Sequence, residues 1–329
     1  MTDSGLRVLE PGRACVQDIG RRGQQQYGVS VRGSSDQYSS AMACALVAND
    51  TSAPLIEATA LGLVVEAVGD LLVAVTGAAC DVTVDGHRVP TWQPLPIAAG
   101  SVVRLSGIHD GLRCYLAVQG RIGAPTLLGS VTPDPGLGFG WYLAAGDLVT
   151  VTSTFVYFDH PHVRHPLMRP AVQVRRFPSP AWIDVTVGPE WTQFVNPREA
   201  LQDNEFVVGN DSDEVGLRLT GPAPARTDRH ELRSRGVGIG AVEVTPSGDV
   251  IVLLRGRMLT AGYPVAAVAT TSAVSVLGQA QPGDRVRFRV VTTEEAIRTA
   301  RSDRAAIEAV AASVRSIIDS VGVALPGGL

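Results

Sequence analysis

The sequence contains no lysine, and all 28 of its basic residues are arginine. This absence excludes a Schiff base, a lysine general base and the lysine of a phosphate-binding loop. Any phosphate must therefore be contacted by arginine, by backbone N–H groups or by a metal ion. The net charge of −4 leaves no basic footprint for a nucleic-acid backbone, so nucleic acid is not an expected partner.

Cysteine is scarce, and long apolar runs are absent. The four cysteines lie far apart, without a CxxC pair, at positions 15, 44, 80 and 114. No segment resembles a signal peptide, and no uncharged apolar run reaches the roughly 18 residues of a membrane helix. We therefore expect a cytoplasmic protein with no membrane partner and with reduced, mostly buried thiols.

Aromatic residues are also few, at 5%, whereas there are 35 glycines and 21 prolines, which favours many turns and short elements. A length of 329 residues with 45% hydrophobic residues suits two domains. Apolar runs typical of strands recur at roughly eight- to twelve-residue spacing, which predicts a mainly β sandwich or barrel. These runs are 63–67, 71–76, 81–84, 102–105, 114–118 and 148–152, then 182–187, 206–208, 215–220, 241–244, 250–254, 265–270 and 286–291.

Few segments predict helices. Residues 35–46 form one short amphipathic helix, and a capping box of Thr292 and Glu295 begins a C-terminal helix over 293–322. We expect an N-terminal domain over 1–158, a linker over 159–181 and a C-terminal domain over 182–292. The linker holds His160, His162 and His165, which we interpret as solvated rather than metal-binding because prolines separate them. A Gly-polar turn precedes a strand three times, at 99–101, 145–147 and 282–284, which suggests two related barrels.

The segment 16–36 combines an acid, adjacent arginines and four glycines in the sequence VQDIGRRGQQQYGVSVRGSSD. Glycine permits close approach of the backbone to a ligand, and arginine offers a forked donor. The segment therefore predicts a site for an anion or a polar amide beside a carboxylate.

Other candidates stay open on the residues alone. Arg113 and Tyr115 share one face of a strand, which is either a polar outer face or part of a pocket. Glu57 is either a strand-edge charge or a buried carboxylate. The glycines of 136–140 are spaced too closely for a dinucleotide loop, although their N–H groups could line a pocket.

Motifs along most of the chain resemble one family. They include VQDIGRRG from position 16, YGV from 27, LVAN ending at 49, YLAVQG from 115, LGS at 128–130, GLRL from 216, GYP at 262–264 and PGDRVRF from 282. The chain is similar to the allophanate hydrolase subunit 2 family, also called the biotin-dependent carboxyltransferases. This family includes the C subunit of 5-oxoprolinase, the carboxyltransferase part of urea carboxylase, and an antagonist of a sporulation-kinase inhibitor.

The resemblance implies two cyclophilin-like β-barrel domains and a partner of the subunit 1 type, which is a second component of 5-oxoprolinase. In the commonest bacterial role, a third, lactam-opening subunit joins them, and the hetero-oligomer converts 5-oxoproline to glutamate with ATP and Mg²⁺. Biotin would have to arrive on a partner. The alternatives are a noncatalytic regulatory role, or carboxyl transfer within an allophanate or urea carboxylase system.

The family motifs also imply functional residues. The catalytic candidates are Asp18, Arg21 and Asp36. The expected substrate- or nucleotide-binding residues are Gly20, Gly23, Tyr27, Gly33, Asn49, Glu57, Arg113, Tyr115, Ser130, Arg218, Gly262 and Tyr263, and no metal ligand is assigned.

Several positions depart from the family pattern. Val131 stands where an arginine is usual, Arg121 where a glycine is usual, and Trp141 where the family pattern reads GR. In the second signature, LLRGRMLTAGYP, the departures are Gly256 for Asp, Met258 for Gln, Leu259 for Thr and Ala261 for Gly. The loss of several polar groups favours the noncatalytic alternative, whereas the intact N-terminal segment favours the enzyme.

Overall fold

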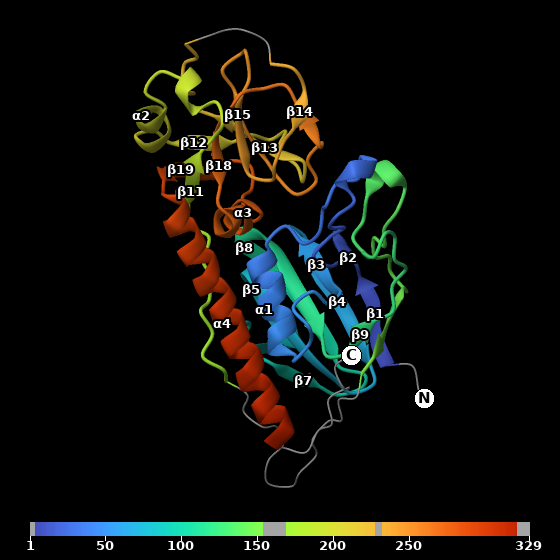
Figure 1. Ribbon diagram of the computed structural model, residues 1–329. Coiled ribbons are helices and arrows are strands. Elements are labelled where there is room, and N and C mark those ends of the chain that lie inside the picture. The colour runs from blue at the N-terminus through green and yellow to red at the C-terminus, as the bar shows by residue number, and fades with distance from the viewer. Residues whose placement is uncertain (1–3, 154–168, 228–231, 321–329) are drawn as a thin grey trace. The chain divides into compact units, whose positions relative to one another are not determined.

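A computed structural model describes residues 4–153, 169–227 and 232–320 (Figure 1). The chain divides into two compact units that are each discontinuous in sequence. The first unit comprises Met1–Gly20, Gln37–Arg176 and Arg304–Leu329, and the second comprises Arg21–Asp36 and Phe177–Asp303. The expected linker histidines lie outside the described residues.

The first unit is built on a ten-stranded, half-barrel sheet with the path β2-β3-β8-β4-β1-β10-β9. β5 also pairs with β6, β7 and β8. The apolar runs 71–76 and 81–84 belong to one strand, as do 102–105 and 114–118, because bulges let the chain bend without ending the pairing. The strands are β1 Ser4–Glu10, β2 Ala14–Gln17, β3 Leu55–Thr59, β4 Leu63–Val68, β5 Leu71–Val84, β6 His87–Val89, β7 Leu95–Ile97, β8 Val102–Val118, β9 Arg121–Ile122 and β10 Leu148–Thr152.

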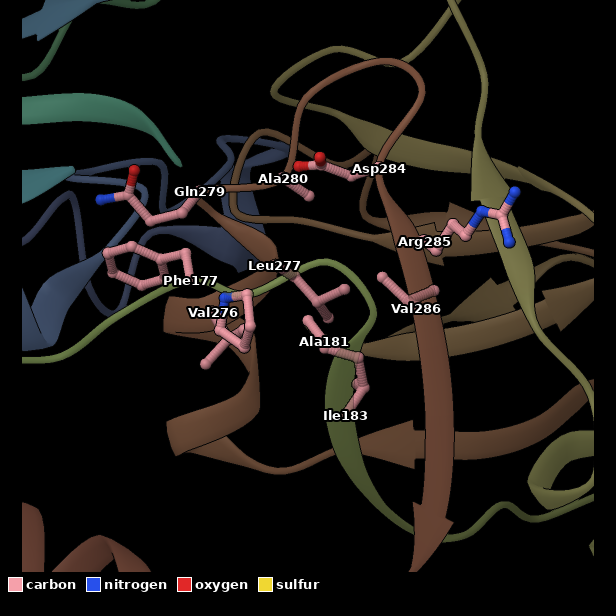
Figure 2. A pocket seen from close by; sticks show the side chains of 11 residues that line it. Phe177, Ala181, Ile183, Val276, Leu277, Gln279, Ala280, Asp284, Arg285 and Val286 are labelled. Atoms are coloured by element: carbon pink, nitrogen blue, oxygen red, sulfur yellow. The ribbon is translucent and has the colours of Figure 1, made fainter. Parts of the chain in front are cut away.

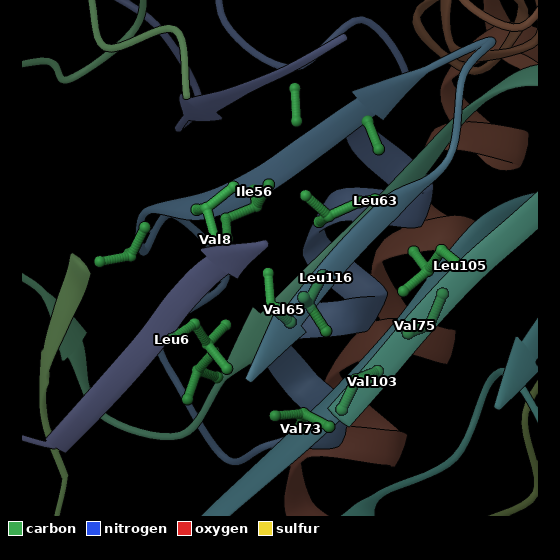
Figure 3. Close-up of a cluster of buried hydrophobic side chains, with 14 of the residues drawn as sticks. Leu6, Val8, Ile56, Leu63, Val65, Val73, Val75, Val103, Leu105 and Leu116 are labelled. Atoms are coloured by element: carbon green, nitrogen blue, oxygen red, sulfur yellow. The ribbon is translucent and has the colours of Figure 1, made fainter. Parts of the chain in front are cut away.

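Alternation along these strands separates two cores. Leu71, Val73 and Val75 join the cluster enclosed by the sheet, whereas Leu72 and Ala74 face the helices (Figure 3). The helix α1 (Gln37–Leu46) contacts β5 and β8, and the C-terminal half of α4 (Thr293–Ser320) packs in the same helix-facing cluster. Both faces of the central strands are therefore buried.

The second unit contains a closed barrel in the order β11-β18-β15-β16-β13-β12-β19. The small sheet of β14 (Arg235–Gly236) and β17 (Thr260–Ala261) is separate from it. The barrel strands are β11 Ala181–Val187, β12 Phe206–Val208, β13 Gly216–Thr220, β15 Ala241–Val244, β16 Val250–Leu253, β18 Val265–Ala269 and β19 Arg285–Val290. The helices are α2 Pro197–Gln202 and α3 Thr271–Leu277, and short 3₁₀ turns are η1 Gln25–Tyr27, η2 Pro135–Leu137 and η3 Trp191–Gln193.

Local sequence signals account for several boundaries. The three repeated turns have Gly100, Gly146 and Gly283 at φ of 83°, 92° and 90°, and each precedes a strand. The capping box is formed, because the Thr292 N–H donates to Glu295 Oε2 at 2.8 Å and the Glu295 N–H donates to Thr292 Oγ1 at 3.1 Å. The predicted mainly β class and the C-terminal helix are confirmed. Across the described segments, no helix is long and apolar enough to cross a membrane.

Candidate functional site

Asp18 anchors a loop of the first unit. Its Oδ1 accepts hydrogen bonds from Ser130 Oγ at 2.6 Å, Thr132 Oγ1 at 2.7 Å and the Gly20 N–H at 2.8 Å. Its Oδ2 accepts from the Val131 N–H at 2.9 Å. Both oxygens of this buried carboxylate are therefore engaged, and Asp18 and Ser130, both expected at the site, are neighbours. The backbone N–H of Val131, which no side-chain substitution removes, takes part in the contact.

A second group in the first unit joins β3 to β8. Arg113 Nε lies 3.6 Å from Glu57 Oε1, and both side chains are nearly buried. Glu57 is the cross-strand partner of Tyr115, which is fully buried on the helix-facing side of the sheet. Of the two interpretations of Glu57, the buried carboxylate is correct, and the arginine beside it compensates the charge.

Asn49 has a structural environment. Its Nδ2 donates to the Val118 carbonyl at 2.7 Å, and its Oδ1 accepts from the Gly120 N–H at 2.8 Å. These bonds fix the chain where β8 ends. They occupy the amide side chain that the family resemblance assigns to ligand binding.

The thiols of the first unit offer little nucleophilic character. Burial, followed by the Glu57 carboxylate, raises the pKa of Cys15, and burial raises the pKa of Cys44 to about 12. Because the thiolate is the reactive form, these two side chains are inert near neutral pH. All four cysteines are free thiols.

The segment Arg21–Asp36 belongs to the second unit, where its two ends are fixed. The Arg21 N–H donates to the Val31 carbonyl at 2.7 Å, and the Arg21 side chain is 1% exposed. At the other end, Gln279 Nε2 donates to Asp36 Oδ2 at 3.0 Å. Gly278 is required beside this contact, because a Cβ there would lie 2.4 Å from the Ser35 carbonyl oxygen. Gln279 was not predicted, since it lies far along the sequence in a segment without a motif.

The two family signatures meet within this unit. Ser30 Oγ donates to the Arg257 carbonyl at 2.6 Å, and the Arg32 N–H donates to the Arg255 carbonyl at 3.1 Å. The loop that follows β16 therefore carries the N-terminal segment. The predicted glycines Gly23 and Gly33 have positive φ in this segment, whereas Tyr27 is 71% exposed.

Arg257 is a site candidate that the motif comparison missed. Its side chain is 6% exposed, and its Nε donates to the Val237 carbonyl at 3.0 Å. Burial lowers the pKa of Arg257, as expected for a charge removed from water. Its position between two altered residues of LLRGRMLTAGYP was the available signal.

One of those altered residues, Gly256, has a packing reason. A Cβ at this position would lie 2.7 Å from the carbonyl oxygen of Glu214, and the Gly256 N–H donates to the same oxygen at 2.9 Å. The aspartate usual in the family would require the backbone here to shift.

Gly262 and Tyr263 line the larger cavity among those described, with a volume of about 690 Å³. Arg226, Thr245 and Ser247 add polar atoms to its wall. This size and mixture of polar and apolar groups suit a small-molecule ligand. The remaining lining residues are Ala223, Pro224, Ala225, Leu232, Val244, Pro246, Gly248 and Pro264.

A charged cluster borders this part of the barrel. Arg235 donates to both carboxylate oxygens of Glu190, with one distance of 2.6 Å, and Glu190 also accepts from the Val265 N–H at 2.9 Å. Burial alone would raise the pKa of Glu190, but these hydrogen bonds lower it. Glu243 on β15 is 2% exposed, and burial raises its pKa to about 7, an effect that Arg235 partly offsets. A carboxyl group that titrates near neutral pH can transfer protons.

A smaller pocket, shown in Figure 2, lies beside Phe177 and Leu277 in the second unit. Its volume of about 10 Å³ accommodates no more than a water molecule. It is therefore not a substrate site. Arg218 likewise lies away from the cavity walls, since it is half-exposed on β13 and pairs with Asp211 at 3.0 Å.

The comparison with family models decides the classification. The model described as "Carboxyltransferase domain, subdomain A and B" matches residues 27–290, which include both signatures. This chain belongs to the carboxyltransferase domain family. The expected family resemblance is confirmed.

Individual relatives agree. The chain is 32% identical over 308 residues to the 5-oxoprolinase C subunit of Escherichia coli K12, covering 91% of this chain and 95% of that protein. It is 27% identical over 342 residues to urea amidolyase of Saccharomyces cerevisiae, covering 97% of this chain and 18% of that protein. The solved structure of Kluyveromyces lactis urea amidolyase superposes with a TM-score of 0.81 at 23% identity, covering 94% of this chain and 20% of that one.

These carboxyltransferase chains differ in extent. The chain spans about a fifth of the two fungal proteins and 56% of a solved chain that is 30% identical to it. The fungal similarities therefore concern one part of longer proteins.

Proposed function

We propose that this chain is the C subunit of an ATP-dependent 5-oxoprolinase. The observation that carries the proposal is the 32% identity to the E. coli protein, which extends over 95% of that protein. A similarity of this extent includes both signature segments rather than one domain. The substrate would be 5-oxoproline, and the product of ring opening would be glutamate.

The partners in this proposal are a protein of the subunit 1 type and a lactam-opening protein. The printed name of the relative describes one component of a multi-subunit enzyme, which supports assembly into a larger complex. A cytoplasmic location belongs to the same proposal. This chain would supply arginines that neutralise charge developing on the activated lactam oxygen or on a phosphoryl group.

Asp18, Arg21 and Asp36 keep their proposed catalytic assignment, with a restriction from their surroundings. Asp18 and Asp36 already accept protein hydrogen bonds, so they are suited to hold the loops in position rather than to abstract a proton. Arg21 is the member of this set that is suited to contact an anion.

ATP would supply the phosphoryl group that activates the lactam, and Mg²⁺ would accompany its phosphates. In the described segments, no group of three or more His, Cys, Asp or Glu side chains could hold a metal ion. Since Mg²⁺ often binds through substrate phosphates and one or two carboxylates, we assign no metal ligand in this chain. Biotin enters only if a partner carries it.

Carboxyl transfer is the second candidate function, favoured by the similarity to urea amidolyase along 97% of the chain. The complex co-expressed with both partners distinguishes the two. Glutamate release from 5-oxoproline with ATP supports the first proposal. Carboxylation of urea with bicarbonate, ATP and a biotinylated carrier supports the second, and a stable complex without either activity supports a regulatory role.

A further inference from the structure

The contact between the two signature segments concentrates positive charge in the second unit. Residues 21–36 and 255–257 contact each other through Ser30 and Arg32. Arg32 reaches the one nearby acid, Glu214, with Nη1 at 3.5 Å from Oε1. The arginines of the two segments are Arg21, Arg22, Arg32, Arg255 and Arg257. This is an unusual concentration in a protein whose net charge is −4.

Arg257 stands out among them because its hydrogen bonding is incomplete. Its Nε donates to the Val237 carbonyl, but its buried Nη1 has no hydrogen-bond partner among the residues that the structure describes. The side chain is 94% buried by area, given its 6% exposure. A buried guanidinium without compensating acceptors is strongly unfavourable. A ligand that supplies negative oxygens would remove this cost.

The backbone around Arg257 is fixed independently of its guanidinium. The Arg257 carbonyl accepts from Ser30 Oγ, and its N–H donates to the Leu254 carbonyl at 3.2 Å. Gly256 before it lies against Glu214. The guanidinium is thus held on a preorganised loop, which is the arrangement that favours ligand binding over side-chain rearrangement.

We propose that Arg257 is an oxyanion-binding residue, which contacts a carboxylate or a phosphoryl group of a small ligand in the second unit. Guanidinium binds both groups through paired N–H donors, so the chemistry is shared by an organic acid and a phosphate. The use of 5-oxoproline as one probe rests on the proposed function. The use of inorganic phosphate does not.

The test measures binding of sodium phosphate and of sodium 5-oxoproline to the full chain by titration calorimetry at constant ionic strength. We compare the wild type with Arg257→Met, Arg257→Lys and the control Arg218→Met, which removes an exposed, paired arginine of the same unit. Arg257→Met should weaken binding by at least about tenfold, from the loss of a charge-assisted hydrogen bond. Arg257→Lys should restore part of it, and Arg218→Met should bind as the wild type does.

Ligand-free unfolding separates this role from a structural one. Because Arg257→Met removes an uncompensated buried charge, its unfolding midpoint should equal or exceed that of the wild type. Binding of phosphate alone identifies a phosphoryl subsite, and binding of 5-oxoproline alone identifies a carboxylate subsite. Wild-type protein that binds neither probe, or Arg257→Met protein that binds them unchanged, overturns the proposal. Loss of glutamate release in the assembled enzyme is not a readout here, so failure of the proposed function is detected separately.

Discussion

At the scale of single residues, the buried carboxylates differ in how completely they are hydrogen-bonded. Asp18 accepts four hydrogen bonds, whereas in the described part of the chain Glu243 Oε1 accepts none. A fully bonded carboxylate stabilises the ionised form, and an unbonded buried one disfavours it. The two residues therefore make opposite predictions for stability.

Replacing Asp18 should destabilise the first unit. Asp18→Ala leaves the Ser130 and Thr132 hydroxyls and the Val131 N–H without their acceptor, so the free energy of unfolding should fall by roughly 2 to 4 kcal/mol. Urea denaturation measures the change. Asp211→Ala, at an exposed ion pair, should change it by less than about 1 kcal/mol. Equal effects of the two variants would show that the Asp18 bonds contribute little.

Glu243 should make stability depend on pH. Burial raises its pKa from 4.5 to about 7, so the folded state holds a proton that the unfolded chain releases. Stability from this group is fully present below pH 4.5, declines as the pH rises to about 7 and then stays level. The loss is on the order of 3 kcal/mol.

The measurement is urea denaturation between about pH 5 and about pH 8, above the range in which Glu190 loses its charge. Arg235 and Glu190 are the charged groups beside Glu243, and Ile251 and Val265 are its apolar cross-strand neighbours. Glu243→Gln should lack this decline, and the exposed control Glu199→Gln should retain it. An unchanged pH profile in Glu243→Gln contradicts the assignment.

At the scale of elements, the second signature loop depends on close backbone approach at Gly256. Gly256→Ala places a Cβ 2.7 Å from the Glu214 carbonyl oxygen, so we expect a loss of about 1 to 3 kcal/mol in unfolding free energy. Gly238→Ala is the matched control, because a Cβ there meets no atom within 4 Å. Thermal unfolding of both variants provides the comparison. Similar midpoints would indicate that the loop relaxes freely.

The capping box of α4 should be a separable contribution. Thr292→Ala removes the acceptor of the Glu295 N–H, which typically costs about 1 kcal/mol. Thr299→Ala, within the helix, removes only a bond to the Glu295 carbonyl and should cost less. Chemical denaturation followed by circular dichroism measures both. A larger effect at Thr299 would contradict the capping role.

Element positions followed from local patterns where the pattern itself sets the structure. The hairpin at Asp85 and Gly86 forms because both residues adopt positive φ, of 50° and 81°. The division of β5 and β8 into separate strands was wrong, because bulges continue the pairing through segments that lack alternation. Strand β1 was not predicted, since its Ser4–Glu10 sequence has no turn signals that distinguish it.

At the scale of the whole molecule, the sequence motifs predicted membership and composition of the site but not its partition. Residues 16–36 are one continuous motif, yet Asp18 belongs to the first unit and Arg21 to the second. Gln279 and Arg257 were missed because their importance arises from contacts with distant segments, at Asp36 and Ser30. Such tertiary contacts have no local signal. The complete catalytic arrangement therefore stays a prediction.

The most direct measurement is ATP-dependent release of glutamate from 5-oxoproline by the purified lactam-opening and subunit 1-type partners, with and without this chain. The proposed function predicts sustained release only when all three proteins, ATP and Mg²⁺ are present. Equal release without this chain, or a stable three-protein complex that releases no glutamate, would contradict it.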